Sequence, residues 1–444
     1  MKISDDKTIY PISAAQRILH WAEMFSLEPH KVKENNVISS YMRVPVECNL
    51  DALEKAFNDL IKYNDALRLR LFRKFRSELQ YIKDFEYMSL PRIQLDGEAA
   101  FNTYLADIRR FKVTFSSESM VWAQLLILGP GDAVLLMRMH HAIIDGYSLR
   151  LIFDQLEKYY EANLRGENPE PEQVFSVVKF FELQQAYAKS EQRRVDRKYW
   201  FHLYTHQRHY SYPAGYRSEF GACSADKLVI DHDEYTRLLQ LASQLGCTLQ
   251  ALMMTLAAFA TYAVTGKENF NIFSLTHGRL TRYLKNTIGC MMNTVPVFYD
   301  LQPDVPIKTQ IRENYLLFLE NLSHGRLPLG ELVPMSYPEA IKHFFNFNPA
   351  WLLFSCMEYG NLFAHSRYKM DLVLSDNQPS QFYLSMLEVP GERLDFDLSY
   401  QTRKYKPQTI KLLLKAYYFI IISTLDHPDW TLRQIRKAYQ EAKE

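Results

Sequence analysis

Between residues 121 and 164, two strand-like runs of the sequence lead into an amphipathic helix. The runs VWAQLLILG and AVLLMRMHH are apolar, and the turn GPGD at residues 129–132 is typical of a β-hairpin. The following SLRLIFDQLEKYYEANL has helical periodicity, with Ser148 placed to cap it. The segment MRMHHAIIDGYS, residues 137–148, therefore lies where a strand becomes a helix.

The rest of the chain mixes helices and strands in the same manner. A helix is predicted after Asn49 as N-cap, and a strand at residues 67–72. The polar stretch RGENPEPEQ, residues 165–173, is the strongest linker signal. Beyond it we expect one long helix over residues 176–204 and two helices that are broken near Gly246. The later runs NFNIFSLTHGR, TVPVFYDL, WLLFSCMEY, FYLSMLEV and LDFDLSYQT are strand-like, and QTIKLLLKAYYFIIISTL is the last long helix. With 444 residues the chain is too long for one core, so we expect two lobes of α+β structure.

Charge and cysteine content exclude several classes of function. The 52 basic and 51 acidic residues leave no net field to attract nucleic acid or an anionic membrane. Five scattered cysteines without a CxxC pair argue against disulfide and zinc frameworks. The N-terminus lacks a secretory apolar region, and the run AYYFIIISTL is about half the length needed to cross a bilayer. We therefore expect a cytoplasmic protein that binds neither nucleic acid nor membrane.

The two histidines leave three interpretations open. His140 and His141 would point to opposite faces of a continuing strand, which disfavours a metal site. A catalytic interpretation needs one histidine as base and a partner that fixes its ring. Asp145 could reach back to His141 across a tight loop at Gly146, or pair with an arginine and hold the loop. The third interpretation is a structural histidine at a strand end.

A series of motifs decides between these interpretations. HHAIIDG resembles the HHxxxDG motif of the condensation domains of nonribosomal peptide synthetases, which are similar to chloramphenicol acetyltransferase. YPISAAQ, NDALRLRL, RKYW, GRLTRYLKNTIGCMMNTVPV and LDFDLSYQTRKYKPQTI resemble the family's other motifs, in the same order, from residue 10 to residue 410. In NDALRLRL, Asn64 and Asp65 stand where the family has His-Glu, so that match is partial.

The resemblance implies an α+β fold of two chloramphenicol-acetyltransferase-like lobes, joined as a V-shaped pseudodimer around a central tunnel. The N-terminal lobe would span residues 1–172 and the C-terminal lobe residues 173–444. It implies amide-bond formation between an acyl or aminoacyl thioester on a carrier protein and an amine that is carrier-bound or soluble. The substrates would ride on the phosphopantetheine of peptidyl or acyl carrier proteins, and the chain would need no cofactor or metal of its own. We expect a free-standing enzyme of secondary metabolism.

The resemblance also assigns residues around the HHAIIDG segment. His141 matches the active-site histidine, which would position the attacking amine and accept its proton. Asp145 matches the structural aspartate, and Arg68 the arginine expected to pair with it. Gly146 matches the glycine whose amide would face the developing oxyanion. His140 is expected to pack into the fold and fix the loop.

Three further residues are assigned to the substrate tunnel. Tyr147 stands where many condensation domains have tryptophan; it would reshape the tunnel or simply pack. Arg279, in the HGR of residues 277–279, would line the tunnel floor or lie on the surface before a helix. Asn293 would line the tunnel or stabilise a loop.

Related chemistries remain as alternatives. Heterocyclisation is disfavoured because His140 stands where DxxxxD would begin, and epimerisation because Leu275 replaces the required glutamate. Ester formation with an alcohol acceptor and a non-catalytic carrier-docking module are the remaining alternatives. The basic residues Arg193, Arg194, Arg197 and Lys198 are either a carrier-docking patch or a solvated helix face.

Overall fold

A computed structural model describes the chain at residues 7–25, 29–44, 48–75, 77–115, 118–171, 173–206, 221–328, 330–332, 352–357, 367–373, 377–378, 382–402 and 405–442. Within these residues the chain divides into two compact units. The first comprises Met1–Ser190, His277–Met292 and Asn361–Asn377, and the second comprises Glu191–Thr276, Asn293–Gly360 and Gln378–Glu444. The expected boundary after residue 172 lies earlier than this division, because helix α6 (Val178–Ala188) and two later segments belong to the first unit.

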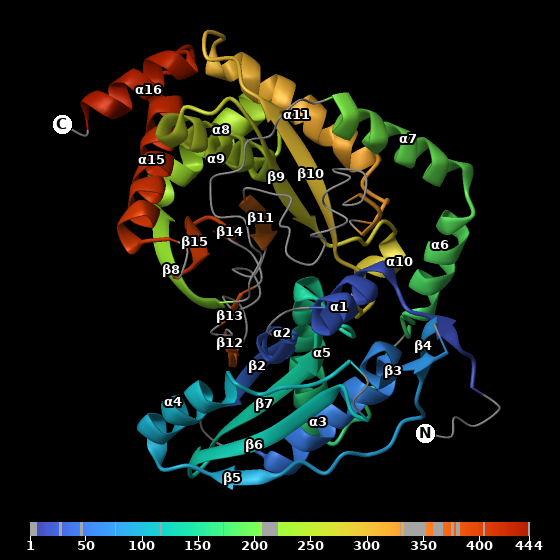
Figure 1. Cartoon of the computed structure of the whole chain (residues 1–444). Helices are drawn as coiled ribbons and strands as arrows, with labels where there is room; N and C mark the ends of the chain where they lie inside the picture. The colour runs from blue at the N-terminus through green and yellow to red at the C-terminus, as the bar shows by residue number, and fades with distance from the viewer. Residues whose placement is uncertain are drawn as a thin grey trace. The chain divides into compact units, whose positions relative to one another are not determined.

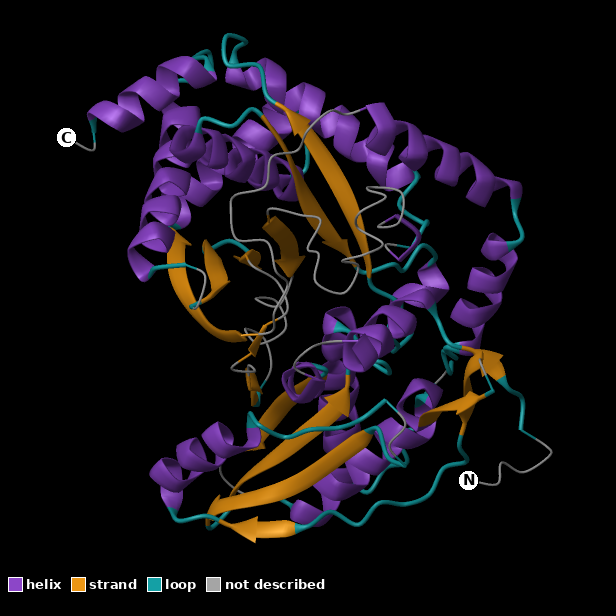
Figure 2. Cartoon of the chain, viewed as in Figure 1, coloured by secondary structure: helices purple, strands orange, loops and turns teal. Residues whose placement is uncertain are grey.

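Both units mix helices and strands (Figures 1 and 2). The strands are β1 (Tyr10–Pro11), β2 (Val37–Val44), β3 (Leu69–Lys74), β4 (Ser77–Ile82), β5 (Arg92–Gln94), β6 (Val121–Gly129), β7 (Asp132–His140), β8 (Gly221–Ile230), β9 (Asn269–Thr276), β10 (Asn293–Asp300), β11 (Leu352–Met357), β12 (Lys369–Val373), β13 (Asn377–Gln378), β14 (Phe382–Val389) and β15 (Arg393–Gln401). The helices are α1 (Ala14–Phe25), α2 (Pro29–Asn35), α3 (Leu50–Tyr63), α4 (Gly97–Ile108), α5 (Gly146–Leu164), α6 (Val178–Ala188), α7 (Glu191–His206), α8 (His232–Leu245), α9 (Leu249–Thr265), α10 (Arg282–Lys285), α11 (Ile307–Ser323), α15 (Pro407–Asp426) and α16 (Leu432–Glu441). These elements confirm the expected α+β class.

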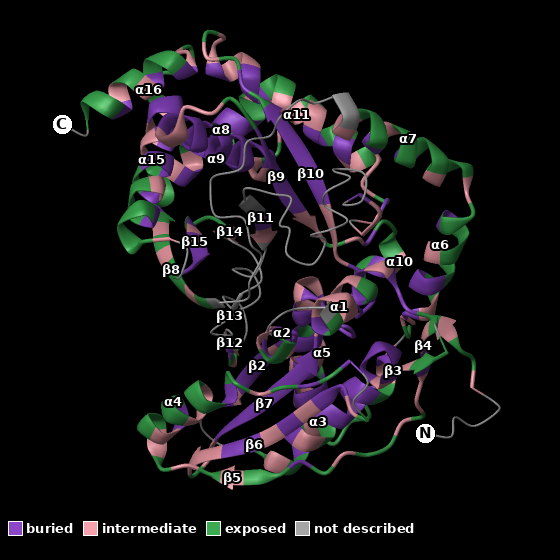
Figure 3. Ribbon diagram, in the orientation of Figure 1, coloured by how far each residue is buried: buried purple, intermediate pink, exposed green. Residues whose placement is uncertain are grey.

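The first unit is built on a five-stranded sheet in the order β12-β2-β7-β6-β5. The hairpin predicted at residues 129–132 joins β6 and β7, and Gly129 pairs with Asp132 across it. β7 is buried along almost its whole length (Figure 3) because α4 covers the face that carries Val134 and Leu136. A strand buried on both faces reads as a continuous apolar run, as AVLLMRMHH does. The position of β7 in the middle of this sheet fixes where His140 and His141 emerge.

The start of α5 differs from the expectation that Ser148 would cap it. Asp145 is the N-cap residue, and its carboxylate accepts from the Ser148 amide at 2.9 Å. The Ser148 hydroxyl lies 3.4 Å from the Asp145 amide, which completes a capping box. The helix therefore begins at Gly146, directly after the DG of the motif.

The second unit is built on a seven-stranded sheet in the order β10-β9-β11-β14-β15-β8-β13. β11 runs parallel to β9 and β14, and the other assigned pairs from β10 to β8 are antiparallel. The core of this unit is α9, which is apolar on all sides and contacts α8, α11, α15 and α16. The break predicted near Gly246 is confirmed, because Gly246 ends α8 in the left-handed conformation at φ 67°.

The single helix expected over residues 176–204 is two helices, α6 and α7. The break lies at Lys189–Ser190, where the Ser190 hydroxyl donates to the Tyr187 carbonyl at 2.8 Å.

Among the described residues one helix, α15, is long and apolar enough to cross a membrane by length and composition. The pair α8 and α9 would meet the same criterion only as one span that is bent by 100°. α15 packs on α9, where the Tyr417 hydroxyl donates to the Met253 carbonyl at 2.9 Å.

Candidate active site

His140, the last residue of β7, is fully buried and serves as a structural anchor. The Ala142 amide donates to His140 Nδ1 at 3.0 Å, so the ring proton resides on Nε2, which donates to Glu23 Oε1 at 2.9 Å. Burial alone would raise the pKa of Glu23, but hydrogen bonds from His140, Asn36 and the Phe115 amide outweigh it and lower that pKa. The prediction that His140 packs into the fold and fixes the loop fits this geometry.

The backbone on both sides of His141 is held in place by residues outside the motif. The His141 amide donates to the Asn36 carbonyl at 2.7 Å. The Ala142 carbonyl accepts from Gln16 Nε2 at 2.9 Å, and Gln16 also donates to Gln80 at 2.8 Å. Gln16 is the last residue of YPISAAQ, so that motif acts as a clamp on the active-site turn. Sequence reasoning matched the motif but assigned no role to Gln16, Glu23 or Asn36.

The His141 ring is the group in this turn that is left available for chemistry. Part of the residue is exposed, whereas its Nδ1 is buried and makes no hydrogen bond to the described residues. Burial lowers the pKa of His141, although a hydrogen bond with its own backbone and the negative charge of Asp145 oppose this shift. The ring is therefore a neutral imidazole at neutral pH, which can accept a proton or a hydrogen bond.

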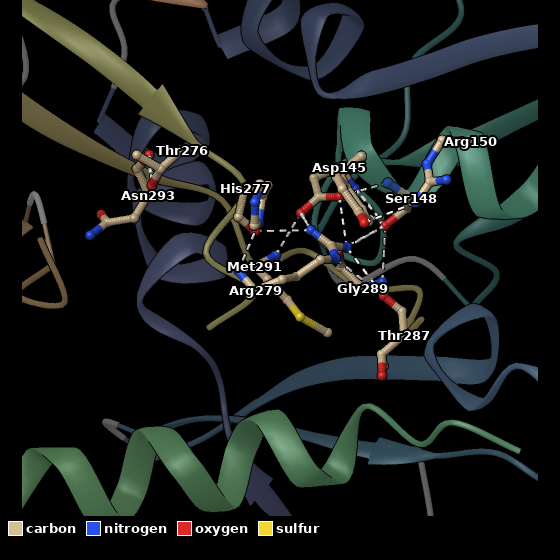
Figure 4. Close-up of polar contacts among 11 residues, drawn as sticks. Asp145, Ser148, Arg150, Thr276, His277, Arg279, Thr287, Gly289, Met291 and Asn293 are labelled. Atoms are coloured by element: carbon tan, nitrogen blue, oxygen red, sulfur yellow. Dashed lines mark hydrogen bonds and ion pairs between the residues drawn. The ribbon is translucent and has the colours of Figure 1, made fainter. Parts of the chain in front are cut away.

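Asp145 is bound by a buried arginine that a distant segment supplies (Figure 4). Arg279 Nη1 donates to Asp145 Oδ2 at 2.8 Å and Nη2 donates to Oδ1 at 3.0 Å, with both side chains at most 2% exposed. The Met291 amide donates to Oδ2 at 2.9 Å, and the Ser148 hydroxyl donates to Oδ1 at 2.8 Å. Burial would raise the pKa of Asp145, but the Arg279 charge and these hydrogen bonds lower it. Asp145 is thus a structural group that joins the start of α5 to the segment carrying Arg279 and Met291.

The prediction that Arg68 pairs with Asp145 was wrong. Arg68 ends a short 3-10 turn before β3, and its Nη1 donates to the Lys83 carbonyl at 2.9 Å. Arg279 was expected either to line the tunnel floor or to lie on the surface before a helix; it is 1% exposed, so the surface alternative was wrong. Its remaining donors are used by carbonyl groups, at 2.9 Å to His277 and 3.0 Å to Gly289. A guanidinium can be buried this deeply because a carboxylate and several carbonyl groups accept from it.

Gly278 and Tyr147 complete the surroundings of this ion pair. Gly278 has φ +65°, and a Cβ atom there would lie 1.8 Å from the Met291 carbonyl oxygen, so the HGR turn requires glycine. The Tyr147 ring lies 4.5 Å from the Arg279 guanidinium, and its hydroxyl accepts from Arg150 Nη2 at 2.9 Å. Tyr147 therefore packs over the ion pair, as its simpler interpretation proposed.

Gly146 and Asn293 lie in different settings. Gly146 is the first residue of α5, where backbone amides have no acceptor within the helix, so its N–H can face a developing negative charge. Asn293 Nδ2 donates to the carbonyls of Gly325 at 2.7 Å and Leu327 at 3.2 Å, which makes it a loop-stabilising residue of the second unit. Among the described residues no group of three or more His, Cys, Asp or Glu could hold a metal ion.

Comparison with solved structures defines the class of fold. The first condensation domain of the calcium-dependent antibiotic synthetase, in complex with a substrate analogue, superposes with a TM-score of 0.78 over 96% of this chain and 98% of that chain, at 16% identity. The starter condensation domain of rhizomide synthetase gives 0.78 over 96% and 97%, at 20% identity. The two-unit α+β architecture is that of condensation domains.

Sequence comparison gives the family. The chain is 23% identical to gramicidin S synthase 2 of Brevibacillus brevis over 98% of its own length and 10% of that protein's, and 24% identical to bacitracin synthase 3 of Bacillus licheniformis over 74% and 5%. The chain thus spans a small part of the curated relatives that it matches. The family model for the condensation domain matches residues 6–444. The chain belongs to the condensation-domain family, which forms amide bonds by acyl transfer.

Proposed function

We propose that this chain transfers an acyl or aminoacyl group from the phosphopantetheine thioester of a carrier protein to an amine. The observation that carries the proposal is the His141 residue, which is partly exposed, directly follows β7 and has a pKa that burial lowers. The His141 amide donates to the Asn36 carbonyl and the Ala142 carbonyl accepts from Gln16, so the backbone on both sides of this ring is fixed.

The reaction needs only one group that takes up a proton. The amine nitrogen attacks the thioester carbonyl, a C–N bond forms, and the C–S bond breaks. The proton lost by the nitrogen passes to His141 and then to the leaving thiolate. The Gly146 amide at the start of α5 would stabilise the oxyanion of the intermediate. Asp145 and Arg279 support this geometry as positioning residues.

The partners and the location belong to the same proposal. Acyl or peptidyl carrier proteins would deliver the donor, the acceptor would be carrier-bound or soluble, and the chain itself would hold no cofactor or metal. We also propose a cytoplasmic location, which is supported by the free thiols of all five cysteines.

Incubation of the chain with acyl-loaded carrier protein and a panel of amines and alcohols tests this function. Mass spectrometry should detect amide products that depend on His141. Ester products alone would assign the chain to the alcohol-accepting alternative. A stable complex with the carrier but no acyl transfer to any acceptor would favour the non-catalytic docking module.

A further inference from the structure

Glu23, a buried residue of α1, is connected to the backbone on both sides of His141. Its Oε1 accepts from His140 Nε2 at 2.9 Å and from Asn36 Nδ2 at 2.9 Å. The His140 ring continues to the turn, because its Nδ1 accepts from the Ala142 amide at 3.0 Å. Asn36 does the same through its carbonyl, which accepts from the His141 amide at 2.7 Å. One carboxylate therefore holds two of the groups that fix the active-site turn.

The contacts of the His140 ring are compatible with one protonation form. The Ala142 amide can only donate, so His140 Nδ1 must be free of a proton to accept from it. The ring proton then lies on Nε2, where it faces a carboxylate oxygen that can only accept. In the opposite tautomer an N–H at Nδ1 would face the Ala142 N–H, and Nε2 would be an acceptor that faces an acceptor. A second proton on the ring would create the same conflict at Ala142.

Three donors converge on the Glu23 carboxylate, which explains why an amide could not replace it. His140 and Asn36 donate to Oε1, and the Phe115 amide donates to Oε2 at 3.1 Å. Burial would raise the pKa of Glu23, but these hydrogen bonds lower it overall, which favours the ionised form that only accepts. A glutamine has one acceptor oxygen and one NH2 group. In either orientation its NH2 group would face a buried donor, on the Phe115 side or on the His140 side.

We propose that Glu23 is a positioning residue of the acyl transfer: it selects the Nε2-protonated tautomer of His140 and so fixes the turn that presents His141. The inference rests on the proposed function, in which His141 accepts the proton of the attacking amine. Glu23 acts through His140 and Asn36 and takes up no proton from the substrate. Because a displacement of a reacting group by about 1 Å can lower a rate about 100-fold, the effect should fall on kcat.

Glu78 offers a matched control in the same unit. Its carboxylate also lies beside a histidine, His20 Nε2 at 3.3 Å, and no hydrogen bond among the described residues joins that carboxylate to the turn. We would label histidine with nitrogen-15 and read the tautomer of His140 by long-range proton–nitrogen NMR, with His140→Gln to identify its signals. The kcat and KM of amide formation from acyl-loaded carrier protein would be measured for the wild-type chain, Glu23→Gln, Glu23→Asp and Glu78→Gln. Circular dichroism would confirm the fold of each.

The wild-type chain and Glu78→Gln should show His140 protonated at Nε2 alone and equal rates. Glu23→Gln should gain protonation at Nδ1 and lose about 10- to 100-fold in kcat, with KM changed by less than about twofold. Glu23→Asp keeps a group that only accepts, so it should retain the tautomer and recover part of the rate.

An unchanged tautomer or a wild-type kcat in Glu23→Gln would overturn the inference, and so would an equal loss of kcat in Glu78→Gln. If Glu23→Gln did not fold, the wild-type chain and Glu23→Asp would decide, because protonation of His140 at Nδ1 in either would overturn it. Absence of acyl transfer by the wild-type chain would refute the proposed function. Transfer that is unchanged in Glu23→Gln would refute only the role of Glu23.

Discussion

Removing the Asp145 carboxylate should destabilise the first unit more than any other single change at the site. The substitution Asp145→Ala would leave the Arg279 guanidinium buried with only carbonyl and hydroxyl acceptors. Breaking a buried ion pair in this way costs about 3–5 kcal/mol. The Ser148 amide would also lose its cap, which adds about 1 kcal/mol. The sum is a large part of the roughly 5–15 kcal/mol that stabilises a typical domain.

Urea unfolding followed by circular dichroism would measure this loss of stability. The variant Arg279→Ala, which removes the other partner of the ion pair, would be measured beside it, with Arg68→Ala as its matched control. Arg68 donates to one carbonyl, so its removal should cost only about 0.5–1.5 kcal/mol. The double variant Asp145→Ala with Arg279→Met should be less destabilised than the sum of the single variants, because no buried charge remains unpaired. A fully stable Asp145→Ala chain with a reduced rate would refute this reasoning and give Asp145 a direct catalytic role.

Further predictions concern the histidine, the HGR turn and carrier docking. His141→Ala should lower the rate of acyl transfer by at least about 100-fold without loss of fold, and near-normal turnover would remove His141 from the mechanism. Because burial lowers the pKa of His141, the acid limb of the wild-type pH–rate profile should lie below the usual 6.5, and a limb above that value would contradict the assignment. Gly278→Ala should cost at least about 2 kcal/mol in unfolding experiments, since the Met291 carbonyl must move; unchanged stability would show that the turn adapts. Arg193 is paired with Glu331, whereas Arg197 and Lys198 form no ion pair among the described residues. If these basic residues dock a carrier, Arg197→Glu with Lys198→Glu should raise the apparent Michaelis constant for the acyl-carrier substrate about three- to tenfold. The reaction with a short soluble thioester should be unaffected. An equal loss of activity with both substrates would end the docking hypothesis.

Local sequence patterns were sufficient to place most elements around the site. The hairpin at residues 129–132, the N-cap at Asn49 and the break at Gly246 follow from turn chemistry and periodicity, which act over a few residues. The end of the predicted helix 176–204 was placed well but its interruption was missed. The break occurs at a serine that is compatible with a helix, so no local signal distinguished one helix from two.

Periodicity and turn residues were enough to place His140 and His141 at a strand end before a helix, and the motifs identified the family. It could not determine which arginine pairs with Asp145. Arg68 and Arg279 are both distant from Asp145 along the chain, and nothing local to either reports its distance from a carboxylate in the fold. The fold selects Arg279, because it packs residues 277–292 with the first unit and encloses Arg279 among a carboxylate and several carbonyl groups. A charge can be buried only where such partners converge, and that convergence is a property of the folded chain.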